Sequence, residues 1–237
     1  MAAKFKARTA DTHAQHIEDL ELAANWHDVL LIGASNFERL GKTHEFSQFA
    51  NRHKVFCAGI GGDRVCHMNW RLTKAPRLLE QVVQPKLVVL MAGTNDIEDT
   101  PSPAALAKGV QNLVWEIKER FGWKNTRVAL MGLLPRRPGQ HLGQSENEQD
   151  KNARALAAKI KQTNLLLEKL DYIDSFEDFG PQFSEPDGSL REDFFRADGV
   201  HLNFDGYRHF LFGLDAVVQD LLARPWPKKG RGGANKT

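Results

Sequence analysis

The chain has 237 residues and a net charge of +2, with 41% apolar and 26% charged residues. That length suits one α/β domain with a full hydrophobic core, and the composition is ordinary for a soluble globular protein. The only cysteines are Cys57 and Cys66, which excludes a disulfide framework, and they do not have the spacing of a metal site.

Charge is unevenly distributed along the chain. Five basic residues and no acidic ones lie in residues 224–237, so residues 1–223 carry 27 basic and 30 acidic side chains, a net charge of −3. A mildly acidic body argues against a nucleic-acid-binding surface, and we expect no nucleic-acid partner. We predict a single domain over residues 1–223 and a basic, disordered tail over residues 224–237.

The first eight residues contain charges but no apolar stretch of the kind that a secretory signal carries. No apolar run approaches the roughly 20 residues needed to cross a membrane. We therefore expect a cytoplasmic protein with no membrane span.

Short apolar strands alternate with helices along the chain. Strands are predicted at residues 29–32, 54–58, 86–91, 127–131 and 172–175. Helices are predicted at residues 11–25, at 37–51 with a break near Gly41, from Asp63 onward with a further turn or two up to residue 83, and at 104–120, 152–169 and 204–223. This alternation predicts βαβ units, and so an α/β fold whose five-stranded parallel sheet is covered on both faces.

The first strand ends at Gly33-Ala34-Ser35, where small residues allow a sharp turn. Ser35 then lies at the carboxyl end of a strand, where open α/β sheets place their ligands. The alternative is that Ser35 only caps the next helix, since serine is a favoured N-cap residue.

Three further loops carry residues that suit acyl transfer. A serine hydroxyl needs a base within hydrogen-bond reach, and the base needs an orienting partner; His201 and Asp198 lie three residues apart and can supply both. The developing oxyanion needs donors, which a Gly62 backbone N–H and the Asn95 amide can offer. Each residue alone could be a turn or cap residue, but four loops with these types in this order favour a catalytic site.

These segments resemble the signature blocks of the SGNH, or GDSL, hydrolases. The resemblance rests on Gly33-Ala34-Ser35, Gly61-Gly62-Asp63, Gly93-Thr94-Asn95-Asp96 and Asp198-Gly199-Val200-His201. More narrowly, the chain is similar to the catalytic subunits of intracellular platelet-activating-factor acetylhydrolase, on Gly59–Asp63, His67 with Trp70-Arg71-Leu72, Gly132–Arg136, and His201-Leu202 before Gly206-Tyr207. The resemblance covers residues 26–222.

The resemblance implies a flavodoxin-like three-layer α/β/α sandwich and ester hydrolysis without a metal or another cofactor. It implies that Ser35 is the nucleophile, His201 the base and Asp198 its orienter. The oxyanion hole would consist of the Ser35 and Gly62 N–H groups and the Asn95 side chain. One departure is Ala34, since the family usually has aspartate there to support the loop.

We therefore predict a serine esterase that hydrolyses short-chain acyl esters through an acyl-enzyme on Ser35. The alternative is a weakly active or silent binding protein of the same fold. The ester is a small-molecule or lipid ester, with O-acetyl groups of carbohydrates or metabolites as the alternative substrate class. A homodimer is left open.

Three further features of the sequence each allow two interpretations. The phenylalanine-rich stretch 176–195 could line an acyl pocket or form a lid, but packing in the core is favoured. Arg136 and Arg137, with His141, could meet an anionic leaving group, but a solvated loop is favoured. His13 and His16 lie three apart on a helix, where a solvated surface pair is favoured over a metal site.

Overall fold

Five short runs of mainly apolar residues form one sheet in the computed structural model, which describes residues 7–22, 27–74, 78–80, 84–122, 124–139 and 145–226. The strands are β1 (Val29–Gly33), β2 (Val55–Gly59), β3 (Leu87–Met91), β4 (Arg127–Met131) and β5 (Ser175–Glu177). The helices are α1 (Ala7–Leu22), α2 (Ser35–Leu40), α3 (His44–His53), α4 (Val65–Thr73), α5 (Pro103–Phe121), α6 (Glu146–Leu167) and α7 (Phe204–Ala223), with 3₁₀ turns η1 (Leu78–Glu80), η2 (Gly180–Phe183) and η3 (Glu192–Phe194).

All neighbouring strands are parallel, in the order β2-β1-β3-β4-β5. The chain goes from β1 to β2 on one side and returns to β3 on the other side of β1, so the strand order reverses between β1 and β3. Open α/β sheets bind their ligands at the carboxyl ends of the strands at such a reversal. Gly33 at the end of β1 lies in register with both Gly59 and Met91. The loops after these three strands therefore start from one level. The predicted α/β fold is confirmed.

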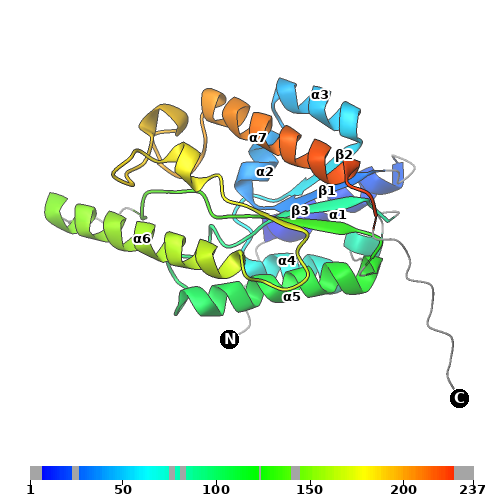
Figure 1. The fold of residues 1–237 in the computed structure, drawn as a ribbon, viewed down its shortest axis with the longest axis horizontal. Coiled ribbons are helices and arrows are strands. Elements are labelled where there is room, and N and C mark those ends of the chain that lie inside the picture. Colours follow the sequence, from blue (N-terminus) through cyan, green and yellow to red (C-terminus); the bar gives the residue numbers. More distant parts are fainter. Residues whose placement is uncertain are drawn as a thin grey trace, which may run out of the picture.

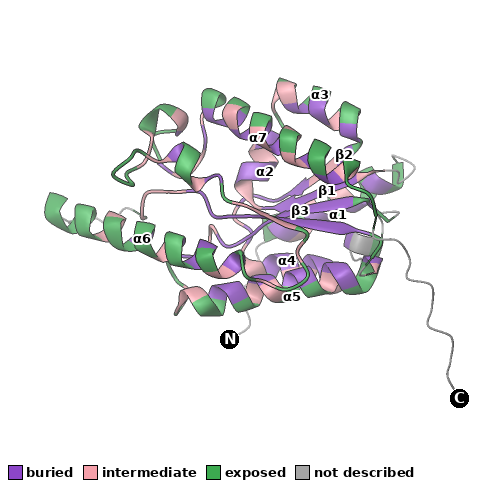
Figure 2. Ribbon diagram, in the orientation of Figure 1, coloured by how far each residue is buried: buried purple, intermediate pink, exposed green. Residues whose placement is uncertain are grey.

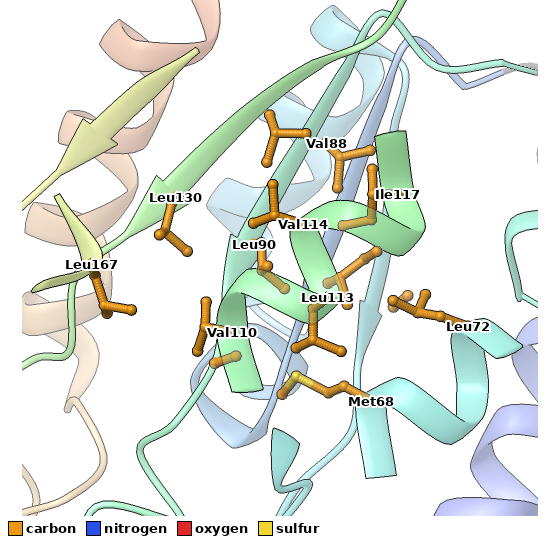
Figure 3. Close-up of a cluster of buried hydrophobic side chains, with 14 of the residues drawn as sticks. Met68, Leu72, Val88, Leu90, Val110, Leu113, Val114, Ile117, Leu130 and Leu167 are labelled. Carbon is orange, nitrogen blue, oxygen red and sulfur yellow. The ribbon is translucent and has the colours of Figure 1, made fainter. Parts of the chain in front are cut away.

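Successive side chains of a strand point to opposite faces of the sheet, so the strands contribute to two hydrophobic cores, one on each face. In β1, Leu30 and Ile32 pack with α4, α5 and α6, whereas Val29 and Leu31 pack with α2, α3 and α7. Figure 1 shows these two helical layers on opposite sides of the sheet. Figure 3 shows the apolar side chains of α5 over Val88 and Leu90 of β3, with Met68 and Leu72 of α4 beside them. The three-layer sandwich follows from this two-sided burial.

Helix α6 begins at Glu146, six residues before the predicted start at 152. Ser145 and Glu148 form a capping box, in which each side chain accepts a hydrogen bond from the other residue's backbone N–H. The added turns project beyond the sheet and are exposed (Figures 1 and 2). The prediction was wrong because it followed the apolar pattern, which starts later than the cap.

Strand β5 is displaced from the predicted 172–175 to Ser175–Glu177. Tyr172 has φ +68°, a left-handed conformation that a strand does not contain. Asp174 explains where pairing starts, because its N–H donates to the Val128 carbonyl and its carboxylate accepts from the Val128 N–H. The strand begins immediately after this contact.

The phenylalanine-rich stretch packs in the core, as predicted. Phe179, Phe183 and Phe195 are buried, and the Phe183 and Phe179 rings contact Phe210 of α7 edge-on or tilted. These aromatic side chains join the 176–195 segment to α7.

Only the start of the predicted basic tail lies among the described residues. The Arg127 guanidinium donates to the carbonyls of Arg224 and Pro225 and lies 4.0 Å from the centre of the Trp226 ring. Residues 227–237 lie outside the described part, so the domain boundary stays a prediction. Within the described ranges, none of the helices combines the length and apolar character needed to cross a bilayer.

Replacing Leu113 by alanine should lower the free energy of unfolding by about 2–5 kcal/mol. The Leu113 side chain, on α5, is 0% exposed and belongs to the core cluster that includes residues of α4 and the sheet. The matched control is Leu165→Ala on α6, where the side chain is 50% exposed and the change should stay within about 0.5 kcal/mol. Urea unfolding of the two variants measures the difference, and equal losses would contradict this assignment of the core.

Candidate active site

The loops after β1, β2 and β3 lie together at the carboxyl edge of the sheet. The Ile60 N–H, just beyond β2, donates to the Gly33 carbonyl at the end of β1, with N and O 3.1 Å apart. Ser35 lies two residues after Gly33 and is the first residue of α2. This edge is where the sequence predicts the catalytic groups.

Three side chains form a continuous hydrogen-bonded chain at this edge. Ser35 Oγ lies 2.9 Å from His201 Nε2, and His201 Nδ1 lies 2.7 Å from Asp198 Oδ2. An ionised carboxylate can only accept, so His201 donates through Nδ1, and Nε2 is left to accept the serine proton. The arrangement can activate the hydroxyl as a nucleophile.

The turn 198–201 holds the carboxylate in place. Asp198 Oδ1 accepts from the backbone N–H groups of Val200 and His201, both at 2.9 Å. Partial desolvation works to raise the pKa of Asp198, but the hydrogen bonds from His201 and Val200 lower it to about 2. The carboxylate is therefore charged throughout the neutral pH range.

The start of α2 is fixed without a capping side chain. Ala34 stands at the N-cap position and makes no side-chain hydrogen bond to the helix. Asn36 is buried next to Ser35, and its side-chain oxygen accepts from the Tyr207 hydroxyl at 3.2 Å. Burial raises the pKa of Tyr207, which keeps this hydroxyl a donor. Helix α7 thus holds the turn that carries Ser35.

The predicted oxyanion donors come from neighbouring loops. Gly62 has φ +81°, a conformation that favours glycine. The Asn95 amide nitrogen donates to the backbone carbonyl of Asp63 at 2.8 Å, which joins the loop after β3 to the residue beside Gly62. An amide nitrogen carries two N–H groups, so this bond leaves one for a ligand. The first backbone N–H of α4, that of Val65, donates to the Asp96 carboxylate at 3.2 Å, a second link between these loops.

Asp63 has a different role from the predicted one. Helix α4 begins at Val65, and the Asp63 carboxylate, instead of opening it, forms a fully buried ion pair with Arg71 at 2.9 Å. The other arm of the Arg71 guanidinium donates to the Ala58 carbonyl at 2.6 Å. The sequence analysis did not predict this ion pair. An acid before a helix and a base eight residues later is not a spacing that indicates an ion pair.

Arg136 is not a solvated side chain, contrary to the favoured expectation. Its guanidinium donates to the Thr94 carbonyl at 2.8 Å and forms an ion pair with Glu98. The side chain is 12% exposed. It therefore fixes the loop that carries Asn95. His141, the third member of that expectation, lies outside the described residues.

Arg137 contacts the loop that carries the histidine. Its backbone N–H donates to the Gly199 carbonyl at 2.8 Å, and its side chain donates to the Ala197 carbonyl and pairs with Glu192. Gly199 has φ +61°, and a Cβ there would lie 2.5 Å from the Arg137 Cγ. Arg136 is paired with Glu98 and Arg137 with Glu192. Either arginine would have to leave its acidic partner to neutralise a charged leaving group.

His13 and His16 do not form the expected solvated surface pair. His13 is 1% exposed and its ring meets Trp70 edge-on, while the His16 ring meets Phe56 edge-on. Burial, followed by the nearby Arg71 charge, lowers the pKa of His16 to about 4. Across the ranges that the structure describes, no group of three or more His, Cys, Asp or Glu side chains is arranged to hold a metal ion.

Comparisons with known proteins match this architecture. Residues 12–209 match the model of the GDSL-like lipase/acylhydrolase family. The human platelet-activating factor acetylhydrolase IB subunit alpha2 is 28% identical over 197 residues, which cover 82% of this chain and 77% of that one.

Two solved structures show a similar fold. A GDSL-like lipase from Bacteroides thetaiotaomicron has a TM-score of 0.65 and 18% identity, covering 88% of this chain and 97% of that one. Est24, a carbohydrate acetylesterase from Sinorhizobium meliloti, has a TM-score of 0.61 and 16% identity, covering 83% of this chain and all of that one. Since the family model spans most of the chain, the protein belongs to the GDSL-like lipase/acylhydrolase family and is a serine hydrolase that acts on ester bonds.

Proposed function

We propose that the protein hydrolyses short-chain carboxylic esters through a covalent acyl-enzyme on Ser35. The observation that carries the proposal is the unbroken chain from Ser35 Oγ to His201 Nε2 at 2.9 Å and from His201 Nδ1 to Asp198 at 2.7 Å. The three residues come from two distant segments, and a structural cap on α2 would need neither partner.

In the first half of the reaction, Ser35 Oγ attacks the ester carbonyl carbon while His201 Nε2 accepts the hydroxyl proton. The carbonyl oxygen becomes an oxyanion, which accepts hydrogen bonds from the Ser35 and Gly62 N–H groups and the Asn95 amide. The C–O bond to the alcohol then breaks, and His201 returns the proton to the departing oxygen.

In the second half, water attacks the acyl carbon and gives its proton to His201. The bond to Ser35 Oγ breaks, the serine regains its proton, and the carboxylic acid leaves. Asp198 stays charged throughout and stabilises the imidazolium that forms in each half.

The short acyl group is supported by two considerations. The names of two similar proteins, an acetylhydrolase and an acetylesterase, specify acetyl esters. In this chain, Phe179, Phe183 and Phe195, which belong to the stretch that could have lined an acyl pocket, are instead buried against α7. A lipid, a carbohydrate or a small metabolite can each provide the alcohol, so the class of leaving group stays open.

Replacing Ser35 by alanine should abolish hydrolysis of p-nitrophenyl acetate and covalent labelling by a fluorophosphonate, because both need the hydroxyl. The melting temperature should change little. Ser47→Ala on the exposed surface of α3 is the matched control and should retain full activity. Activity of Ser35→Ala within a few-fold of the wild type would contradict the proposal.

Replacing Asn95 by alanine should lower kcat by roughly 10²–10³-fold with little change in KM, since the oxyanion develops mainly in the transition state. Fluorophosphonate labelling should slow but still occur at Ser35. Because the amide also donates to the Asp63 carbonyl, the melting temperature must be measured alongside. Asn112→Ala, exposed on α5, is the control; retention of more than about a third of wild-type kcat by Asn95→Ala would place the oxyanion donors elsewhere.

Replacing Asp198 by asparagine should lower kcat by roughly 10⁴-fold, because the new NH₂ group cannot accept from His201 Nδ1. The folded-state pKa of Asp198, about 2, lies below its ordinary value of 3.8, so its contribution to stability is present above pH 4 and is lost as the pH falls toward 2. Urea unfolding should show a difference between wild type and Asp198→Asn that is constant above about pH 5 and shrinks below about pH 4. A difference that persists unchanged to pH 2 would show that charge on Asp198 is not what stabilises this turn.

A further inference from the structure

The first turn of α1 reaches the loop that carries Gly62, although α1 precedes the sheet and its first residues lie before the family match at 12–209. The Thr9 hydroxyl donates to Asp63 Oδ1 at 2.8 Å. Thr9 is 1% exposed and Asp63 is 0% exposed, so water does not compete for this bond.

Arg8 supports the same loop from its other side. Its guanidinium donates to both carboxylate oxygens of Glu38, at 2.8 and 2.9 Å. Glu38 Oε2 in turn accepts the Gly61 N–H at 2.7 Å. A Cβ on Gly61 would lie 3.1 Å from the Arg8 guanidinium, so the side chain covers the glycine. One turn of helix therefore fixes the residues on both sides of Gly62.

Asp63 passes this constraint to the other oxyanion donor. Its second carboxylate oxygen accepts from Arg71 at 2.9 Å, and its backbone carbonyl accepts from the Asn95 amide at 2.8 Å. Loss of the Thr9 hydroxyl would leave Asp63 Oδ1 buried without that donor. A buried carboxylate that lacks a donor shifts to recover one, and a shift of Asp63 moves both the Gly62 N–H and the Asn95 amide.

We propose that Thr9, supported by Arg8, is a positioning residue that holds the Gly62 N–H and the Asn95 amide at the oxyanion. The inference rests on the proposed function, because it assumes that these groups bind the oxyanion. In this proposal, the geometry of the oxyanion donors depends on α1, a helix that precedes the first βαβ unit. A misplacement on the order of 1 Å at such donors is enough to cost up to about 10²-fold in rate.

The test is Thr9→Val, which keeps the shape of the side chain and removes the donor. We expect kcat for p-nitrophenyl acetate to fall about 10-fold with KM within about twofold. A trifluoromethyl ketone forms a tetrahedral oxyanion adduct with the serine, so its inhibition constant should rise by the same factor. Thr9→Ser keeps the hydroxyl and should restore both values. Arg8→Gln, which leaves Glu38 bound to Lys42, should lower kcat about threefold.

Thr126→Val is the matched control. Thr126 is also 1% exposed, and its hydroxyl donates to the Pro85 carbonyl at 2.7 Å. Unlike Thr9, Thr126 lies just before β4, at the amino edge of the sheet and away from the proposed site. It should lower the melting temperature while leaving kcat and the ketone affinity unchanged.

The outcomes separate the two proposals. If the wild type is labelled by fluorophosphonate but Thr9→Val keeps wild-type kcat and ketone affinity, or changes them only as Thr126→Val does, the positioning role is overturned. If Thr9→Val does not fold, Arg8→Gln decides: unchanged kcat and ketone affinity overturn the role. If the wild type itself is not labelled, the proposed function fails first.

Discussion

A buried ion pair at the edge of the sheet constrains much of this structure. Asp63 and Arg71 are both fully buried, and moving two charges out of water costs several kcal/mol for each ion unless the geometry restores that energy. Here the guanidinium also binds the Ala58 carbonyl, and the carboxylate also binds the Thr9 hydroxyl. The pair is tolerated because β2, α1 and α4 each supply a partner, and it therefore fixes these elements relative to one another.

The backbone connects this ion pair to the proposed oxyanion donors. The loop between β2 and α4 contains Gly62 and Asp63, so fixing the carboxylate fixes the glycine beside it. In the neighbouring loops, the Arg136 guanidinium donates to the Thr94 carbonyl, and the Arg137 backbone N–H donates to the Gly199 carbonyl. Buried or partly buried arginines thus contact three of the four loops that carry the proposed site: Arg71 through the Asp63 carboxylate, and Arg136 and Arg137 through backbone carbonyls.

The sequence allowed the fold to be predicted, and it pointed to three residues that the structure places in contact, because both follow from local signals. Apolar runs that end in small residues predicted β1 and β3. Residue chemistry and the family resemblance singled out Ser35, Asp198 and His201, whose side chains are hydrogen-bonded to one another in the structure. The displaced β5 was missed because its position depends on the Asp174 contact with β4, which is a tertiary interaction.

The supporting contacts could not be predicted for the same reason. Asp63 has the sequence context of a helix cap, and only the fold brings Arg71 and Thr9 to its carboxylate. Adjacent arginines on a polar loop favour a solvated interpretation, and only the fold places acidic residues and carbonyls around them. Ion pairs and hydroxyl hydrogen bonds between distant elements leave no periodic pattern in the sequence. The sequence therefore indicates candidate catalytic residues more readily than the contacts that hold them in place.

Ala34 shows how such contacts can replace a missing side chain. The sequence resemblance implies aspartate at this position, and alanine leaves the start of α2 without a side-chain cap. The turn is instead held by the residues that follow: Asn36 by the Tyr207 hydroxyl, and Glu38 by Arg8, Lys42 and the Gly61 N–H. These contacts tie α2 to α7 and α1. Support for the turn that carries Ser35 therefore comes from two helices distant in the sequence, so substitutions on α1 or α7 should also affect this turn.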